Sequence, residues 1–140
     1  MAKLKSILLL LMAMVVASME FHQSAAREHV VGDSFGWIVP PNDDFYIIWS
    51  LHNVFTFNDA LIFNFANGSH TVAEVTKEAY QNCDAGNPIS LHTTSPARFT
   101  INSLGNHFYI CTIGPHCNSH QKLAIRVTPT ANNSSALLPH

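Results

Sequence analysis

A short run near the C-terminal end of the chain holds side chains of the types that bind transition metals. Cys111 is followed by His116 and then by Gln121, and His70 stands alone upstream. One thiolate, two imidazoles and a weak axial amide oxygen form the donor set of a blue copper site, whose ion accepts and returns one electron. The residues therefore predict a metal site of His70, Cys111, His116 and Gln121, with electron transfer as its chemistry.

The expected elements around these residues explain how one loop can supply three of the ligands. Cys111 ends an apolar run that predicts a strand, and Gly114-Pro115 then turns the chain. Gln121 opens the next expected strand, residues 122–127. The loop between the two strands thus returns three ligands to one point, and His70 can join them from a separate strand.

Other interpretations of this cluster compete with copper. Cys111 and His116 could form a thiol nucleophile and its base, but no third group orients the histidine and no substrate motif accompanies them. Zinc could use His70 with the same pair, although glutamine is a poor fourth ligand for structural zinc. We expect one type 1 copper ion and no enzymatic activity. The main alternative function is a cell-wall or glycan-associated interaction module in which copper chemistry is incidental.

Residues 1–26 have the composition of a secretory signal peptide. Lys3 and Lys5 precede an apolar run from Ile7 to Ala17. Small residues at 24–26 then form a cleavage signature, so the mature chain should begin near Arg27. A membrane anchor is the alternative, but the run is shorter than the ~20 apolar residues of a spanning helix. We expect secretion to the cell wall or apoplast, without a membrane span in the mature chain.

The remaining chain is mildly acidic, and its few basic residues are not clustered. Such a surface repels phosphate backbones, which argues against a nucleic-acid partner. Residues 128–140 hold only the short apolar group 136–138, whereas a lipid-anchor signal needs an apolar tail of about 10 to 20 residues. We expect a monomer, free or peripheral to the outer face of the plasma membrane. Its redox partner, a protein or a small molecule, is unknown.

Three asparagines stand in the acceptor pattern for N-linked glycans, namely Asn67, Asn132 and Asn133. The pattern has consequences only in a secreted chain, which is the context that the leader predicts. The two tail sites are adjacent, so we do not expect both to be used. A sugar on Asn67 would lie close to His70.

Apolar residues recur at every second position in several short runs, which predicts half-buried strands. The clearest runs are 60–65 and 122–127, and residues 99–101 and 108–111 repeat the pattern. Turn residues rich in Gly, Pro and Asn separate the runs. Many short strands at this spacing favour an all-β fold, either a two-sheet sandwich or a barrel.

Only residues 76–82 favour a helix, with Thr76 as a candidate N-cap. We expect one domain over residues 27–128, with Trp37, Trp49 and the Phe-rich runs as its core. The polar tail, residues 129–140, is expected to be disordered.

The chain has three cysteines, Cys83, Cys111 and Cys117, in a predicted oxidising compartment. Three pairings are possible, and only the pairing of Cys83 with Cys117 leaves Cys111 free beside His116. Copper would protect such a free thiol from oxidation. Without a metal, Cys111 would be a buried inert thiol or would form an intermolecular bridge.

From Val31 to Val127 the chain resembles the phytocyanins, a family of plant blue copper proteins. The resemblance rests on these blocks: Val31 to Ser34 with Gly36-Trp37, Tyr46 to Trp49, Phe63 to Phe65, His70 to Val75, Tyr80 with Cys83, Asn87-Pro88, and Phe108 to Gln121. It implies a Greek-key, cupredoxin-like β-sandwich with a short helix. It also implies equatorial ligands His70, Cys111 and His116, axial Gln121, and a Cys83–Cys117 disulfide. Glutamine at the axial position is similar to the stellacyanin and mavicyanin branch.

Two positions depart from the pattern of that family. Pro115 stands directly before His116 where the family usually has glycine, and proline removes a backbone donor and restricts Gly114. His120 also stands where glycine is common, next to Gln121. It could crowd the mouth of the site or compete as a ligand.

Overall fold

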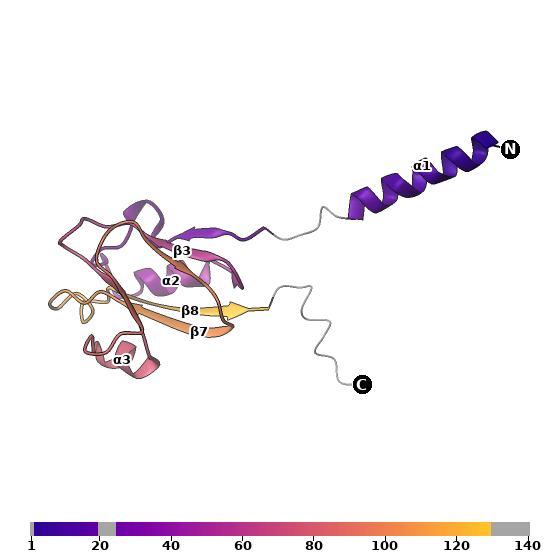
Figure 1. Cartoon of the computed structure of the whole chain (residues 1–140). Helices are drawn as coiled ribbons and strands as arrows, with labels where there is room; N and C mark the ends of the chain where they lie inside the picture. The colour runs from indigo at the N-terminus through magenta and orange to yellow at the C-terminus, as the bar shows by residue number, and fades with distance from the viewer. Residues whose placement is uncertain (1, 20–24, 130–140) are drawn as a thin grey trace, which may run out of the picture.

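The computed structural model describes residues 2–19 and 25–129. Helix α1, Ala2–Met19, covers most of the predicted signal peptide (Figure 1). Its side chains over residues 2–14 are exposed. No helix within the two described ranges has the length and apolar character to cross a membrane. The tail expected over residues 129–140 lies, apart from Pro129, outside the described residues. The domain limits at 27 and 128 stay predictions.

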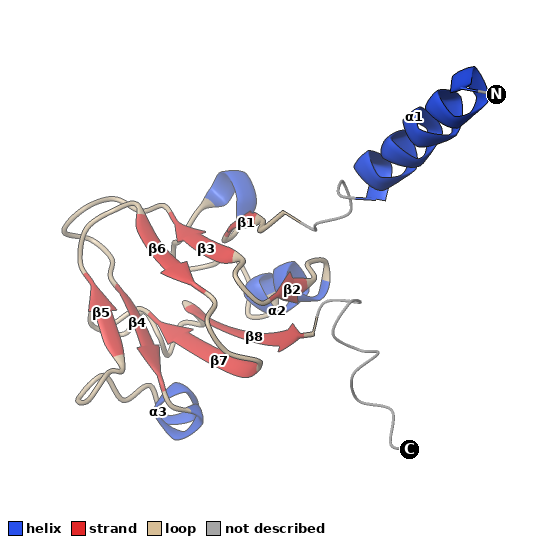
Figure 2. Ribbon diagram, turned by 45° about the vertical axis from the view of Figure 1, so that its right-hand side comes forward, coloured by secondary structure: helices blue, strands red, loops and turns tan. Residues whose placement is uncertain are grey.

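Two mixed sheets build the domain, which confirms the predicted all-β, two-sheet fold (Figure 2). The smaller sheet has the order β1-β3-β6, and the larger has the order β2-β8-β7-β4-β5. The strands are β1 Glu28–Val30, β2 Phe55–Thr56, β3 Ala60–Phe63, β4 Val72–Val75, β5 Ser90–His92, β6 Ala97–Thr100, β7 Gly105–Ile110 and β8 Lys122–Thr128. β1 pairs parallel with β3 and β2 pairs parallel with β8, while the other pairs are antiparallel.

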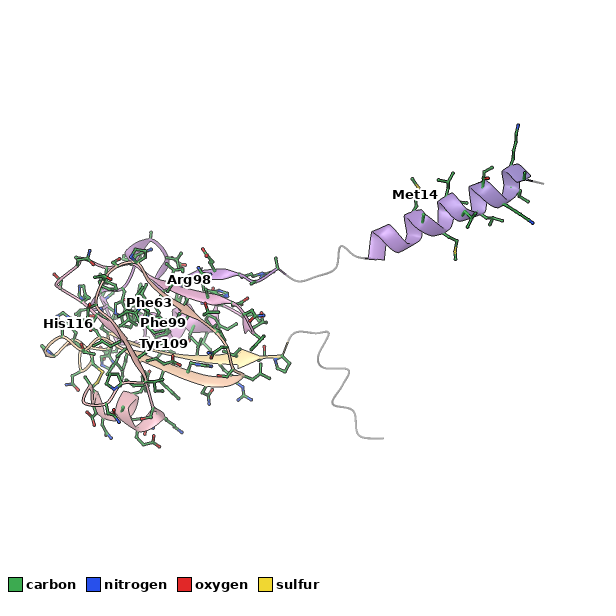
Figure 3. The ribbon with its side chains drawn as sticks, viewed as in Figure 1. Met14, Phe63, Arg98, Phe99, Tyr109 and His116 are labelled. Atoms are coloured by element: carbon green, nitrogen blue, oxygen red, sulfur yellow. A yellow bond between two sulfur atoms is a disulfide. The ribbon has the colours of Figure 1, made fainter. Side chains whose placement is uncertain are left out.

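Aromatic side chains fill the space between the sheets. Phe63, Phe99 and Tyr109 lie within 5.5 Å of one another by ring centroid and come from β3, β6 and β7 (Figure 3). Trp37 meets the edge of Phe63 at 4.9 Å and is fully buried, as the sequence predicted. The predicted alternation is clearest in β8, where Leu123, Ile125 and Val127 are buried.

The short helix expected over residues 76–82 is present as α3, Lys77–Asn82. The hydroxyl of Thr76 accepts a hydrogen bond from the backbone N–H of Ala79, which is the expected N-cap. The expectation of a single helix in the mature domain is wrong, because α2 spans Phe45–Leu51 and a 3-10 helix spans Asp33–Phe35.

Helix α2 has a composition that does not favour helix, since it is rich in aromatic and β-branched residues. Tertiary packing decides instead, because Tyr46 and Trp49 lie one turn apart on a common face and are both buried in the core. The Tyr46 hydroxyl donates to the carbonyl of Gly36 or Ile38 and accepts from the N–H of Ile38. These contacts fix the helix against the loop that carries Trp37.

One end of the larger sheet gathers the predicted ligands. β7 runs toward this end and is followed by Cys111, and β8 starts from it directly after Gln121. β4 is antiparallel to β7 and therefore also starts here, two residues after His70. Figure 3 places His116 at this end, opposite the end where β8 leaves the domain.

Candidate copper centre

The structure brings His70, Cys111 and His116 together although His70 is distant in sequence. The sulfur of Cys111 and one nitrogen of each ring all lie within 4.8 Å of one another. Nδ1 of His116 lies 3.5 Å from Sγ of Cys111, and the two imidazole rings are 5.0 Å apart by centroid. Within the described residues this is the one group of three or more His, Cys, Asp or Glu side chains able to share a metal ion.

Backbone hydrogen bonds close the loop that carries three of the candidate ligands. The N–H of Cys111 donates to the carbonyl of Gln121 at 3.1 Å, which continues the β7–β8 pairing past the strand ends. The N–H of Gln121 donates to the carbonyl of His116 at 3.0 Å. Both ends of the loop and its middle are therefore tied together by the chain itself.

Gln121, the predicted axial ligand, lies beside the cluster. Its side chain is fully buried, and Nδ1 of His70 donates a hydrogen bond to its Oε1 at 3.1 Å. Its Nε2 has no hydrogen-bond partner among the described residues. Burying an unpaired amide N–H is costly. The position thus holds a side chain whose oxygen faces the cluster, as an axial donor requires.

Burial differs among the three clustered side chains. Cys111 is 1% exposed, and it is the free cysteine of the described chain, while the rings of His70 and His116 are half-buried. Burial lowers the pKa of His70, and the neighbouring His116 lowers it further, against the hydrogen bond to Gln121. A lowered pKa favours the neutral imidazole, which is the form that binds metals.

The spacing of the Cys111 and His116 donor atoms fits a shared transition-metal ion. Bonds of about 2.3 Å to sulfur and about 2.0 Å to imidazole nitrogen, at angles between tetrahedral and trigonal, leave the two donors roughly 3.5 to 3.8 Å apart. The observed separation between Cys111 and His116 is 3.5 Å. A soft thiolate with two imidazoles suits copper. The Gln121 oxygen lies beside this set, 3.1 Å from Nδ1 of His70.

Two threonines that the sequence analysis did not single out connect the segment before β4, which carries His70, to the segment after β7, which carries Cys111. Thr71 follows His70, Thr112 follows Cys111, and their hydroxyl oxygens are 2.6 Å apart. The N–H of Thr112 donates to Oγ1 of Thr71 at 2.9 Å, and the indole of Trp37 donates to the Thr71 carbonyl at 2.8 Å. The signal that could have identified them is a hydroxyl residue directly after each of two ligands.

The two departures from the family pattern are accommodated. Gly114 adopts a positive φ of 44°, so the restriction that Pro115 places on it is met by a glycine conformation. His120 also has a positive φ, 69°, and its Nε2 lies 3.4 Å from Oδ1 of Asp43. The ring of His120 therefore faces Asp43, and His120 is not part of the metal-binding group.

The structure contains the Cys83–Cys117 disulfide that the resemblance implies. Cys117 is buried beside His116 and packs with Ala73 and Ile110 of β4 and β7. Cys83 caps the C-terminus of α3. The bridge thus attaches the ligand loop to α3, on the outer face of the larger sheet.

One of the three predicted glycan acceptors lies in the described chain. Asn67 is exposed in the turn before His70, and its Oδ1 accepts a hydrogen bond from the N–H of Ser95 at 2.7 Å. Asn132 and Asn133 lie outside the described residues. Glycosylation stays a prediction at all three positions.

Comparisons with known proteins agree with this fold. The family of plastocyanin-like domains matches residues 37–121. A blue copper protein of Arabidopsis thaliana is 38% identical over 79% of this chain and 57% of its own length, so this chain spans little more than half of that relative. The cucumber peeling cupredoxin of Cucumis sativus is 38% identical over 79% of this chain and 81% of its own length. The solved structure of cucumber stellacyanin with Cu²⁺ superposes with a TM-score of 0.71 at 36% identity, covering 76% of this chain and 99% of that one.

These similarities and the site geometry define a cupredoxin-type copper protein. The chain belongs to the family of plastocyanin-like domains and, within it, to the phytocyanins. The family resemblance and the cupredoxin fold expected from sequence are thereby confirmed. His70, Cys111 and His116 are positioned as a possible type 1 copper site.

Proposed function

We propose that this protein is a one-electron carrier with a single type 1 copper ion bound by His70, Cys111 and His116, with Gln121 as the axial ligand. The convergence of one thiol and two imidazoles within 4.8 Å carries the proposal. The buried Gln121 oxygen directed at His70 supports the fourth position. The blue copper proteins and stellacyanin among its relatives support the same metal.

Each candidate ligand has its own task. When bound, copper supplies one-electron chemistry by alternating between Cu(II) and Cu(I). Cys111 contributes a thiolate from a site closed to water, which protects the sulfur from oxidation. His116 is half-buried at the end of the domain (Figure 3), and we assign its exposed part as the route by which electrons enter and leave.

The surrounding chain holds the ligands in place without help from a metal. Cys111 and Gln121 are joined through the backbone, and the Thr71–Thr112 pair joins the segment of His70 before β4 to the segment of Cys111 after β7. A site whose donors do not rearrange between oxidation states exchanges electrons with little reorganisation. The rigidity of the fold around the ligands therefore supports electron transfer as the function of the site.

We place this carrier outside the cell, as a monomer that reacts with a separate electron donor and acceptor. The leader composition supports secretion, and the relatives named as blue copper proteins support a carrier that makes and breaks no substrate bond. The partner is a redox protein or a small reducing or oxidising molecule.

The test is the visible absorption and paramagnetic resonance spectrum of the copper-loaded mature domain. We expect an intense blue charge-transfer band from the thiolate, and Cys111→Ser should abolish the band while leaving the fold intact by circular dichroism. Ser119→Ala, in the same loop but outside the cluster, is the matched control and should keep the band. A colourless copper complex in the unmodified domain would contradict the proposal, and preferential retention of zinc would favour the structural zinc interpretation.

A further inference from the structure

Asp59 is a buried carboxylate that lies in the turn before β3 and accepts hydrogen bonds from three directions. It is 1% exposed. Its Oδ1 accepts from the backbone N–H of Arg27 at 2.9 Å, and its Oδ2 accepts from the N–H of Thr56 at 3.1 Å and from Nε2 of His29 at 2.9 Å. Two of these donors, Arg27 and His29, lie outside the turn, so Asp59 also connects the turn to β1 and to the segment that leads into it.

The contact with Arg27 is notable because Arg27 is the first residue after the predicted signal peptide. Residues 25–27 are exposed and have no regular secondary structure, so a peptidase can reach the Ala26–Arg27 bond. The carbonyl of Arg27 accepts from the N–H of Ala60 at 2.9 Å, directly before β1 pairs with β3. Both backbone polar groups of Arg27 are therefore fixed by the segment 59–60.

We propose that hydrolysis of the Ala26–Arg27 bond by a secretory peptidase converts the Arg27 amide into an N-terminal ammonium that forms an ion pair with the buried Asp59. Water supplies the atoms of the step: hydroxide adds to the carbonyl carbon of Ala26, which leaves as a carboxylate, and the Arg27 nitrogen takes up protons to become –NH₃⁺. The Asp59 carboxylate thus binds the new N-terminus. The inference rests on the leader and on this contact, and it is independent of the proposed copper function.

The change at Arg27 is a change of charge at an unchanged position. Before cleavage its nitrogen offers one proton and no charge, whereas the ammonium offers three protons and a full positive charge at the same 2.9 Å distance. Charge-assisted hydrogen bonds are about twice as strong as neutral ones. Cleavage therefore strengthens the attachment of β1 to the smaller sheet.

Asp59 is ionised and can therefore pair with the N-terminal ammonium of Arg27. Burial alone would raise its pKa, but the hydrogen bonds from the Arg27 backbone, His29 and Thr56 together hold the pKa below its ordinary value. His29 is the other titratable group that faces Asp59, and its Nδ1 lies 3.4 Å from Oδ1 of Asn53. Glu28, the adjacent acid on β1, is exposed and pairs with Arg98 of β6 instead.

The first test is the N-terminal sequence of the protein secreted from the full chain. We expect Arg27 at the first cycle. Any other mature terminus would place the new ammonium away from Asp59 and would overturn the proposal.

The second test compares three purified domains that start at Arg27, at Ala25, or at an acetylated Arg27. At pH 7 the unfolding equilibrium constant of the Arg27 form should be about tenfold lower than that of either other form, which corresponds to one unit of pKa shift. An ammonium that gains a partner has a raised folded-state pKa, so its stabilisation is complete below the unfolded-state pKa of about 7.7 and is lost as pH rises through the folded-state pKa. The three forms should therefore converge near pH 10.

Asp59→Asn should remove the difference between the three forms, whereas Glu28→Gln, the matched control, should preserve it. Because Asp59→Asn could also unfold the domain, the α-amino pKa of the unmodified Arg27 form is measured separately by ¹⁵N-resolved titration. A value at least one unit above the ordinary ~7.7 supports the ion pair, and an ordinary value overturns it. Circular dichroism of the copper-free domain checks the fold in each form, so a failure of the ion pair is distinguishable from a failure of copper binding.

Discussion

Replacing Thr71 by valine should destabilise the domain more than any other single-hydroxyl removal near the copper centre. Thr71 is only 7% exposed, and valine has nearly the same shape without the hydroxyl. The substitution leaves the N–H of Thr112 without its 2.9 Å acceptor and the Thr112 hydroxyl without its 2.6 Å partner. The orphaned backbone N–H is the larger loss, because it cannot rotate toward another acceptor.

The magnitude follows from these two bonds. Leaving a buried donor unpaired costs about 1 to 3 kcal/mol. At about 2 kcal/mol, and at about 4 °C for each kcal/mol in a domain of roughly 100 residues, Thr71→Val should lower the melting temperature by about 8 °C. Thr112→Val removes only the bond between the hydroxyls, since Thr71 still accepts from the backbone N–H. Its cost should be about 1 kcal/mol or less.

The assay is thermal unfolding of the copper-free domain for both single variants and the double variant. The two side chains touch, so their effects should not add. Chelator competition on the copper-loaded proteins gives a second measurement, in which Thr71→Val should release copper faster than Thr112→Val. Equal melting temperatures for the two single variants, or a Thr71→Val loss below about 2 °C, would refute the assigned order.

Three further predictions test the axial ligand, the disulfide and the core. Gln121→Met should raise the reduction potential, because a thioether is a softer donor that favours Cu(I); voltammetry showing no rise would contradict the assignment. Replacing Cys83 and Cys117 by alanine should cost about 4 kcal/mol for a sequence separation of 34, measured by denaturant unfolding, and an unchanged midpoint would refute this. Burial raises the pKa of all three tyrosines, so the absorbance of their phenolates should appear well above pH 10. The free energy of unfolding should fall as pH rises past about 10, because tyrosines in the unfolded chain deprotonate first. A tyrosine of the folded domain that titrates near pH ~10 would contradict this.

The elements that the sequence predicted correctly are those in which local pattern and burial agree. β8 alternates buried residues with half-buried or exposed ones, and α3 begins directly after the capping residue Thr76. The positions of Cys111, His116 and Gln121 were predictable because they lie on one short loop between two such strands. Few residue types can bind a metal, so a set of ligands is easier to predict from sequence than the packing of a core is.

The features that sequence reasoning missed depend on contacts between distant segments. Helix α2 has poor local propensity and exists because Tyr46 and Trp49 enter the core. No local pattern pairs His29 with Asp59, since β1 must first align parallel to β3 before their side chains meet. Parallel pairing leaves no hairpin signal in the sequence, so β1 and β2 were not predicted.

The candidate copper centre is held from two sides by connections that do not involve a metal. On the outer face of the larger sheet, the disulfide attaches Cys117 of the ligand loop to α3. On the core side, the indole of Trp37 donates to the Thr71 carbonyl while the Thr71 hydroxyl accepts from the backbone N–H of Thr112, next to Cys111. Because the second connection runs through the tryptophan at the centre of the core, loss of core packing reaches the ligands directly. Substitutions that loosen the core should therefore lower the free energy of unfolding and also change the visible spectrum of the copper-loaded protein.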